Sequence, residues 1–101
     1  MTTKFFFKSY NKEDFKILDL KIKDNNLFLK VEMNAYIELI ANGYRPEIDL
    51  NQVKTFIFKD IVFNGSINMP YYLNNIYFND RLHLVINDID ISINSNDIDI
   101  V

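Results

Sequence analysis

The sequence predicts an all-β domain, an antiparallel and hairpin-rich sandwich or rolled sheet of six to eight strands. Three observations support this fold class. Along most of the chain apolar residues alternate with polar ones, which is the period of a strand with one buried face. Hydrophobic residues make up 49% of the chain and include nine Phe and six Tyr, which is enough apolar surface for a packed core. Turn-forming Asn, Asp and Gly separate the alternating runs.

A chain of 101 residues has room for one core, so we expect a single β-rich domain over residues 1–101. No apolar run reaches the length of a membrane helix, and the first residues lack the pattern of a signal peptide. Because the chain contains no Cys, it has neither a disulfide framework nor thiolate chemistry. These features predict a cytoplasmic protein with no membrane partner.

Two alternating runs, residues 15–22 and 27–37, form the first predicted hairpin. The apolar phase changes between Ile17 and Leu18, which predicts a β-bulge or a strand start at that point. Residues 24–26 join the runs, and their Asn residues tolerate the left-handed backbone of a tight turn.

The middle of the chain is less regular. A short helix near 34–42 is an alternative to the end of the second run, because apolar residues group there. Residues 53–63 are rich in β-branched and aromatic residues and are predicted as a strand. The dipeptide Asn64-Gly65 then predicts a hairpin into a short strand at residues 67–69, which ends at Pro70.

The last part of the chain contains the letters Asn-Asp-Ile-Asp-Ile twice, at 87–91 and at 96–100. We interpret residues 87–101 as a hairpin with a two-residue turn at Ser95-Asn96. In that register Ile93 faces Ile98 and Ile91 faces Ile100, so that all four side chains reach one core. The outer face would then carry Asp88, Asp90, Asp97 and Asp99.

This acidic face allows three interpretations. A calcium site is disfavoured because residues 87–101 contain no Gly and because side chains on one strand face project in parallel. The face is either solvated, keeping a sheet edge from pairing with other chains, or a docking surface for a basic partner. A second candidate contact surface is the aromatic segment after Pro70, which would either anchor a partner or cap the core. Its tyrosines are Tyr71, Tyr72 and Tyr77.

The charges are unevenly distributed along a chain whose formal net charge is −3. Residues 1–30 contain seven Lys and four acidic residues, and residues 31–101 contain ten acidic residues and four basic ones. A nucleic-acid-binding surface needs clustered basic residues to neutralise phosphates, so the acidic balance argues against nucleic acid as the main partner. This uneven distribution would also arise if the basic and acidic ends of the chain paired with each other in one sheet.

Catalytic chemistry has few candidates. The single His, His83, is predicted to point away from the face of Leu82 and Leu84, and one His supplies no metal triad. The two Gly of the chain do not form a phosphate-binding loop. We therefore expect no enzyme activity, no cofactor and no metal.

A hydrophobic pattern spans most of the chain. Its parts are Asp14-Phe15-x-Ile17, the hairpin from Leu20 to Val31, Phe56-x-Phe58-x-x-Ile61-Val62-Phe63, Leu82-x-Leu84-x-Ile86 and Ile98-x-Ile100. This pattern resembles that of the small all-β immunity proteins of bacterial polymorphic toxin systems, although Glu13 stands where related families often have His. The resemblance implies a protein that binds and blocks a cognate toxin, and it implies no catalytic residues.

The sequence therefore predicts a small acidic protein-binding inhibitor or immunity-type protein. Its partner is expected to be another protein, a toxin or other effector with a basic surface. The alternatives are a small-molecule or carbohydrate-binding β-domain and a structural assembly component. The predicted contact residues are Asp88, Asp90, Asp97, Asp99, Tyr71, Tyr72 and Tyr77.

Overall fold

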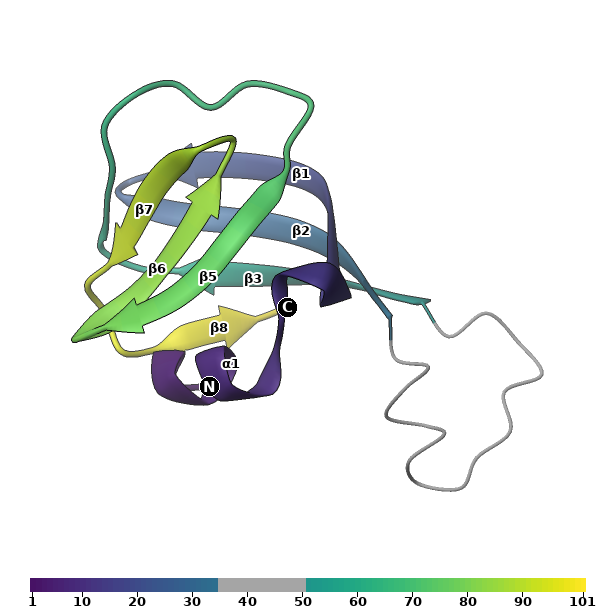
Figure 1. Cartoon of the computed structure of the whole chain (residues 1–101), viewed down its shortest axis with the longest axis horizontal. Helices are drawn as coiled ribbons and strands as arrows, with labels where there is room; N and C mark the ends of the chain where they lie inside the picture. The colour runs from purple at the N-terminus through teal and green to yellow at the C-terminus, as the bar shows by residue number, and fades with distance from the viewer. Residues whose placement is uncertain (35–50) are drawn as a thin grey trace.

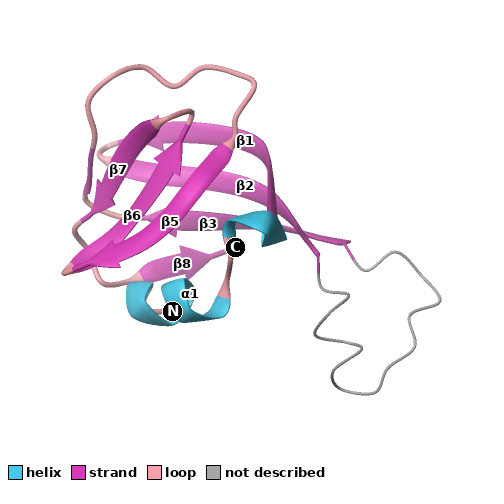
Figure 2. Cartoon of the chain, viewed as in Figure 1, coloured by secondary structure: helices cyan, strands magenta, loops and turns pink. Residues whose placement is uncertain are grey.

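The computed structural model describes residues 1–34 and 51–101, which form a sandwich of two four-stranded antiparallel sheets (Figures 1 and 2). The predicted all-β class is confirmed. The strand order is β1-β2-β3-β8 in the first sheet and β4-β7-β6-β5 in the second. The strands of the first sheet are β1 (Phe15–Lys23), β2 (Asn26–Asn34), β3 (Asn51–Phe58) and β8 (Ile98–Ile100). Those of the second sheet are β4 (Ile61–Val62), β5 (Leu73–Asn79), β6 (Arg81–Ile86) and β7 (Ile89–Ile93).

The predicted first hairpin is confirmed as β1 and β2. Asp24 and Asn25 make its turn with φ angles of 53° and 61°, the left-handed values that short-chain polar residues adopt most readily. The predicted bulge is also present, because the register shifts between Ile17 and Asp19. The extra residue, Leu18, has no partner in β2, so that Leu18 and Asp19 are both exposed while Ile17 and Leu20 pack against the core.

The strand predicted over residues 53–63 is divided between the two sheets. β3 ends at Phe58, the chain turns at Asp60 with a φ of 53°, and β4 begins at Ile61 in the other sheet. The hairpin predicted at Asn64-Gly65 is wrong, since β4 pairs with β7 and residues 67–69 form no strand. The chain from residue 63 to 72 instead arches from one edge of the second sheet to the other (Figure 1).

The hairpin predicted over residues 87–101 is also wrong. β7 pairs with β6 and β4, whereas β8 pairs with β3 in the opposite sheet. Ser95 and Asn96 therefore carry the chain across the sandwich and do not form a hairpin turn. Ile91, Ile93 and Ile98 are nevertheless buried, as predicted, whereas Ile100, which was predicted to reach the same core, is 39% exposed. Alternation determines which face of a strand is buried, but it does not specify which neighbour supplies the hydrogen bonds.

A helix that the sequence analysis did not predict opens the chain. In α1 (Thr3–Ser9) the hydroxyl of Thr2 caps the first turn by accepting a hydrogen bond from the Phe5 amide. Phe6 projects from α1 into the core, where its ring centroid lies 5.4 Å from those of both Phe56 and Phe58. The short 3₁₀ turn η1 (Lys12–Asp14) leads into β1. The alternative helix near 34–42 lies outside the described residues.

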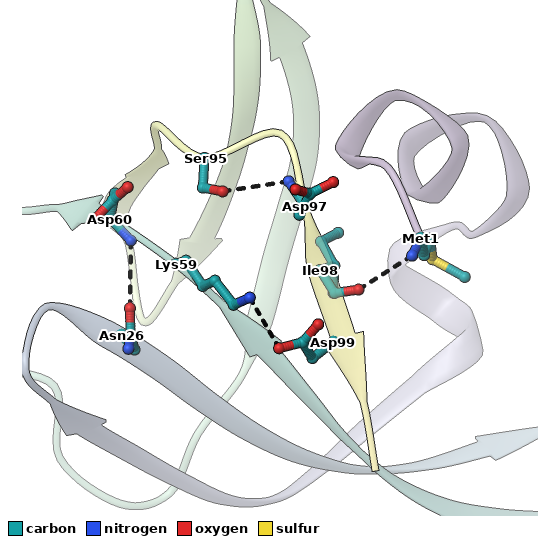
Figure 3. A network of polar contacts seen from close by, with 8 residues as sticks. All are labelled: Met1, Asn26, Lys59, Asp60, Ser95, Asp97, Ile98 and Asp99. Atoms are coloured by element: carbon teal, nitrogen blue, oxygen red, sulfur yellow. Dashed lines mark hydrogen bonds and ion pairs between the residues drawn. The ribbon is translucent and has the colours of Figure 1, made fainter.

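The N-terminal residues also cover the outer edge of β8. The amide of Ile98 donates to the Met1 carbonyl at 2.8 Å, and the Thr3 amide donates to the Asn96 carbonyl at 2.9 Å. The amino group of Met1 donates to the carbonyl of Ile98 at 3.2 Å (Figure 3). In the first sheet this leaves β1 as the strand whose outer edge has no strand partner among the described residues. No helix in the described part of the chain is both long and apolar enough to cross a membrane.

Candidate functional site

An apolar groove of about 700 Å³ lies between the edge strand β1 and the residues that lead into β5. Among its described lining residues, Lys16 alone carries a charge. Three of the apolar side chains are largely accessible, with exposed fractions of 38% for Leu18, 73% for Met69 and 62% for Tyr72. The full lining is Phe15, Lys16, Ile17, Leu18, Met69, Pro70, Tyr71, Tyr72 and Leu73. We call this site the edge groove.

One wall of the edge groove is the bulged part of β1. Phe15, Lys16, Ile17 and Leu18 of this strand all line the groove. Ile17 packs against the core, whereas Leu18 has no register partner in β2 and is 38% exposed. This wall therefore ends at the bulge that the phase change in the sequence predicted.

The second wall is held by Asn87, which lies in the turn between β6 and β7. Its side-chain amide donates to the carbonyls of Asn68 at 2.8 Å and Pro70 at 3.0 Å. Its side-chain oxygen accepts from the Tyr72 amide at 2.8 Å, and its own amide donates to the Tyr72 carbonyl at 3.0 Å. Four hydrogen bonds therefore fix a segment that belongs to no strand. The sequence analysis did not identify Asn87 as a site residue, because one Asn among many carries no signal of its own.

The predicted tyrosine contacts do not form a single patch. Tyr71 and Tyr72 both line the edge groove, with Tyr71 packed against the core and Tyr72 exposed. Tyr77 lies on the outer face of the second sheet, where its ring stacks on His83 with the centroids 4.4 Å apart. The sequence order could not reveal this separation, since Tyr77 follows Tyr72 by only five residues but belongs to strand β5.

The four predicted aspartates do not form a single acidic face. Asp88 and Asp90 belong to the turn and strand of β7 in the second sheet, whereas Asp97 and Asp99 border or lie in β8 of the first. Figure 3 shows Lys59 directed at Asp99, and their charged atoms are 2.9 Å apart. Asp99 thus has a basic neighbour within the chain. This pairing raises the pKa of Lys59 through the hydrogen bond and the charge of Asp99.

Asp90 is the centre of a polar cluster that links three strands. It accepts a hydrogen bond from the Tyr77 hydroxyl, and its other oxygen lies 2.9 Å from Nδ1 of His83. Burial raises the pKa of Asp90, but the hydrogen bonds from Tyr77 and His83 outweigh this effect and lower it below the usual value. The bond to Asp90 in turn raises the pKa of Tyr77.

This cluster can hold a carboxylate ionised and fasten β5, β6 and β7 on their outer face. His83 points away from the buried Leu82 and Leu84, as predicted, and its side chain is 15% exposed beneath the tyrosine ring. Within residues 1–34 and 51–101, no group of three or more His, Asp or Glu side chains is positioned to hold a metal ion. Comparison of the chain with protein-family models, curated proteins and solved structures finds no match. The geometry of the edge groove is therefore the main basis for a functional proposal.

Proposed function

We propose that this chain is a small protein-binding module of the inhibitor or immunity type, which holds an apolar segment of a partner protein in the edge groove. One observation carries the proposal: exposed Leu18, Met69 and Tyr72 border a groove whose irregular wall is fixed by Asn87. Exposed Met and Tyr side chains are enriched at the centres of protein interfaces. A wall that is ordered before binding also reduces the entropy lost on association.

A protein segment suits the edge groove because one of its walls is a free strand edge. Within residues 1–34 and 51–101, β1 pairs with β2 on one side only, so backbone groups on its other side are available to an added strand. The bulge limits such pairing to short stretches on either side of Leu18. A partner would then place its side chains in the groove while its backbone follows part of β1.

The test is capture of the partner from the native cell with the tagged chain, followed by affinity measurement with the purified partner. The double variant Met69→Ser/Tyr72→Ala should weaken binding by more than tenfold, since truncated interface anchors commonly cost about 2 kcal/mol or more. Phe5→Ala is a matched control, because Phe5 is an aromatic residue of similar exposure, at 57%, on α1. If both variants bind equally well, the edge groove is not the docking site.

The proposal retains a protein partner but changes the surface on which it rests. The basic partner expected from the sequence depended on four aspartates sharing one face, and these are divided between two sheets. A basic partner therefore stays a prediction, to be tested by the salt dependence of binding. The proposal includes no catalytic step.

A small-molecule or carbohydrate ligand is the second candidate, because about 700 Å³ lies within the usual range for ligand sites and two tyrosines line the groove. A thermal-shift screen separates the two candidates, since a specific ligand raises the unfolding temperature of wild type but not of the groove variant. An assembly role through the free edge of β1 would instead appear as an oligomer in sedimentation measurements.

A further inference from the structure

We propose that the outer face of β1 and β2 carries a second docking site, for an acidic surface of a protein. This site is a hollow of about 330 Å³ on the outer side of the first sheet, and it is distinct from the edge groove. The lining residues are Asp19, Lys21, Lys23, Phe28, Lys30 and Thr55. We call it the lysine hollow. The inference does not depend on the function proposed for the edge groove.

The strand register explains why the lysines gather. In β1, Lys21 and Lys23 are two residues apart and therefore project from the same face. Lys30 of β2 joins them across the hairpin, because the antiparallel pairing brings residues 26–30 alongside residues 19–23. The inward faces of the same strands carry buried Leu27 and Leu29, so the lysines are confined to the outside.

The positive charge of the lysine hollow is only partly compensated. Asp19 stands opposite Lys30 in the register and balances it. Lys21 stands opposite Phe28, and Lys23 stands opposite Asn26, so neither faces an acid. No ion pair within the described residues involves Lys21 or Lys23.

The same sheet offers one further carboxylate in line with Lys21. The register runs from Lys21 through Phe28 and Ile57 to Asp99 at the far side of the sheet. Asp99 is already 2.9 Å from Lys59, so it does not neutralise the hollow (Figure 3). Although the net charge of the chain is −3, the lysine hollow is therefore a local basic surface. Such surfaces attract partners of opposite charge.

The apolar part of the hollow favours a protein over a nucleic acid. Half-buried Phe28 provides an apolar floor between the lysines, whose aliphatic stems extend it. Single-stranded nucleic acids are bound by several aromatic rings in succession, and Phe28 is the one ring that lines this hollow. A protein surface with carboxylates around an apolar side chain matches both features.

The test measures binding of fluorescent poly-L-glutamate to the full chain at low salt. The variant Lys21→Gln/Lys23→Gln/Lys30→Gln should weaken binding at least about tenfold, because local charge raises the concentration and encounter rate of an opposite ion by about 10- to 1,000-fold. The control Lys4→Gln/Lys8→Gln/Lys12→Gln changes the net charge equally at exposed residues of α1 and η1. It should change the affinity less than twofold. A Lys→Arg version of the first variant keeps the charge and should bind like wild type.

Three results would overturn the proposal. The first is that wild type does not bind poly-L-glutamate at low salt. The second is an equal loss in both glutamine variants, which would mean that overall charge and not the lysine hollow decides binding. The third is tighter binding of oligothymidine than of poly-L-glutamate with the same dependence on Lys21, Lys23 and Lys30, which would assign the hollow to nucleic acid. The edge-groove residues are unchanged in all of these variants, so failure here leaves the proposed function intact.

Discussion

Asp90 and Asp99 occupy the same position in the two copies of Asn-Asp-Ile-Asp-Ile, yet they lie on opposite outer faces of the sandwich. Asp90 bonds to Tyr77 and His83 on the second sheet, and Asp99 pairs with Lys59 on the first. Each side chain projects outward because the adjacent isoleucines, Ile91 and Ile98, are buried. Two identical stretches thus have different neighbours, and the aspartates of the repeat do not form one acidic surface.

The assignment of β8 to the first sheet can be tested by cross-linking, since the chain has no Cys of its own. The pair Ile57→Cys/Asp99→Cys should form a disulfide, because these residues are register partners. Antiparallel partners have Cα atoms about 4.5–5.5 Å apart, within the range of disulfides. The pair Ser92→Cys/Asp99→Cys should stay reduced, because its members lie on outer faces of sheets about 10 Å apart. Mass spectrometry under non-reducing conditions detects the disulfide in either variant. A disulfide in Ser92→Cys/Asp99→Cys alone would support the hairpin over residues 87–101 instead.

The contribution of α1 to stability is predicted from the contrast between neighbouring phenylalanines. Phe6→Ala should lower the free energy of unfolding by about 3–5 kcal/mol, because the 1% exposed ring packs among Tyr10, Phe15, Phe56 and Phe58. Phe5→Ala, at 57% exposure, should change it by less than about 0.5 kcal/mol. Urea denaturation followed by circular dichroism measures both values. Similar losses from the two variants would show that α1 does not dock through Phe6.

Asn87 is predicted to hold the wall of the edge groove. Asn87→Gly keeps the left-handed backbone, where φ is 51°, and removes three side-chain hydrogen bonds. We expect a stability loss of about 1–3 kcal/mol and faster hydrogen exchange at the Tyr72 amide, which donates to the Asn87 side chain. Exposed Asn64 lies in the same connection, so Asn64→Gly serves as the control. An unchanged exchange rate at the Tyr72 amide in Asn87→Gly would show that Asn87 does not hold this wall.

The stability contributed by Asp90 should depend on pH. Its pKa is lower in the folded protein than in the unfolded chain, where an Asp titrates near pH 3.9, so folding favours the ionised form. The stability difference between wild type and Asp90→Asn should therefore be constant above about pH 5 and should decrease as the pH falls through the lowered pKa. We expect less than about 1 kcal/mol, since the side chain is 48% exposed.

The control for this pH profile is Asp88→Asn, because the Asp88 carboxylate makes no hydrogen bond or ion pair with the described residues. The stability difference between wild type and Asp88→Asn should therefore lack the pH dependence expected for Asp90→Asn. Equal pH profiles for the two variants would contradict the cluster of Asp90 with Tyr77 and His83. Denaturant unfolding at each pH provides the measurement.

Local sequence predicted the features that depend on neighbours along the chain. The all-β class, the turn at Asp24 and Asn25, the bulge beside Leu18 and the outward direction of His83 all follow from alternation and turn propensity. The same reasoning identified Ile91, Ile93 and Ile98 as core residues. For the site, it selected Tyr71 and Tyr72, which line the edge groove.

Tertiary structure alone decided the features that depend on which strands meet. A buried isoleucine satisfies its apolar requirement in either sheet, so its alternation carries no information about strand partners, and β8 pairs with β3 instead of β7. The docking of Phe6, the hold of Asn87 on Tyr72 and the separation of Asp90 from Asp99 all arise from such long-range pairings. The sequence by itself determined which face of most strands is buried, whereas the packing of the two sheets determined that Phe6 enters the core and which exposed side chains share a surface.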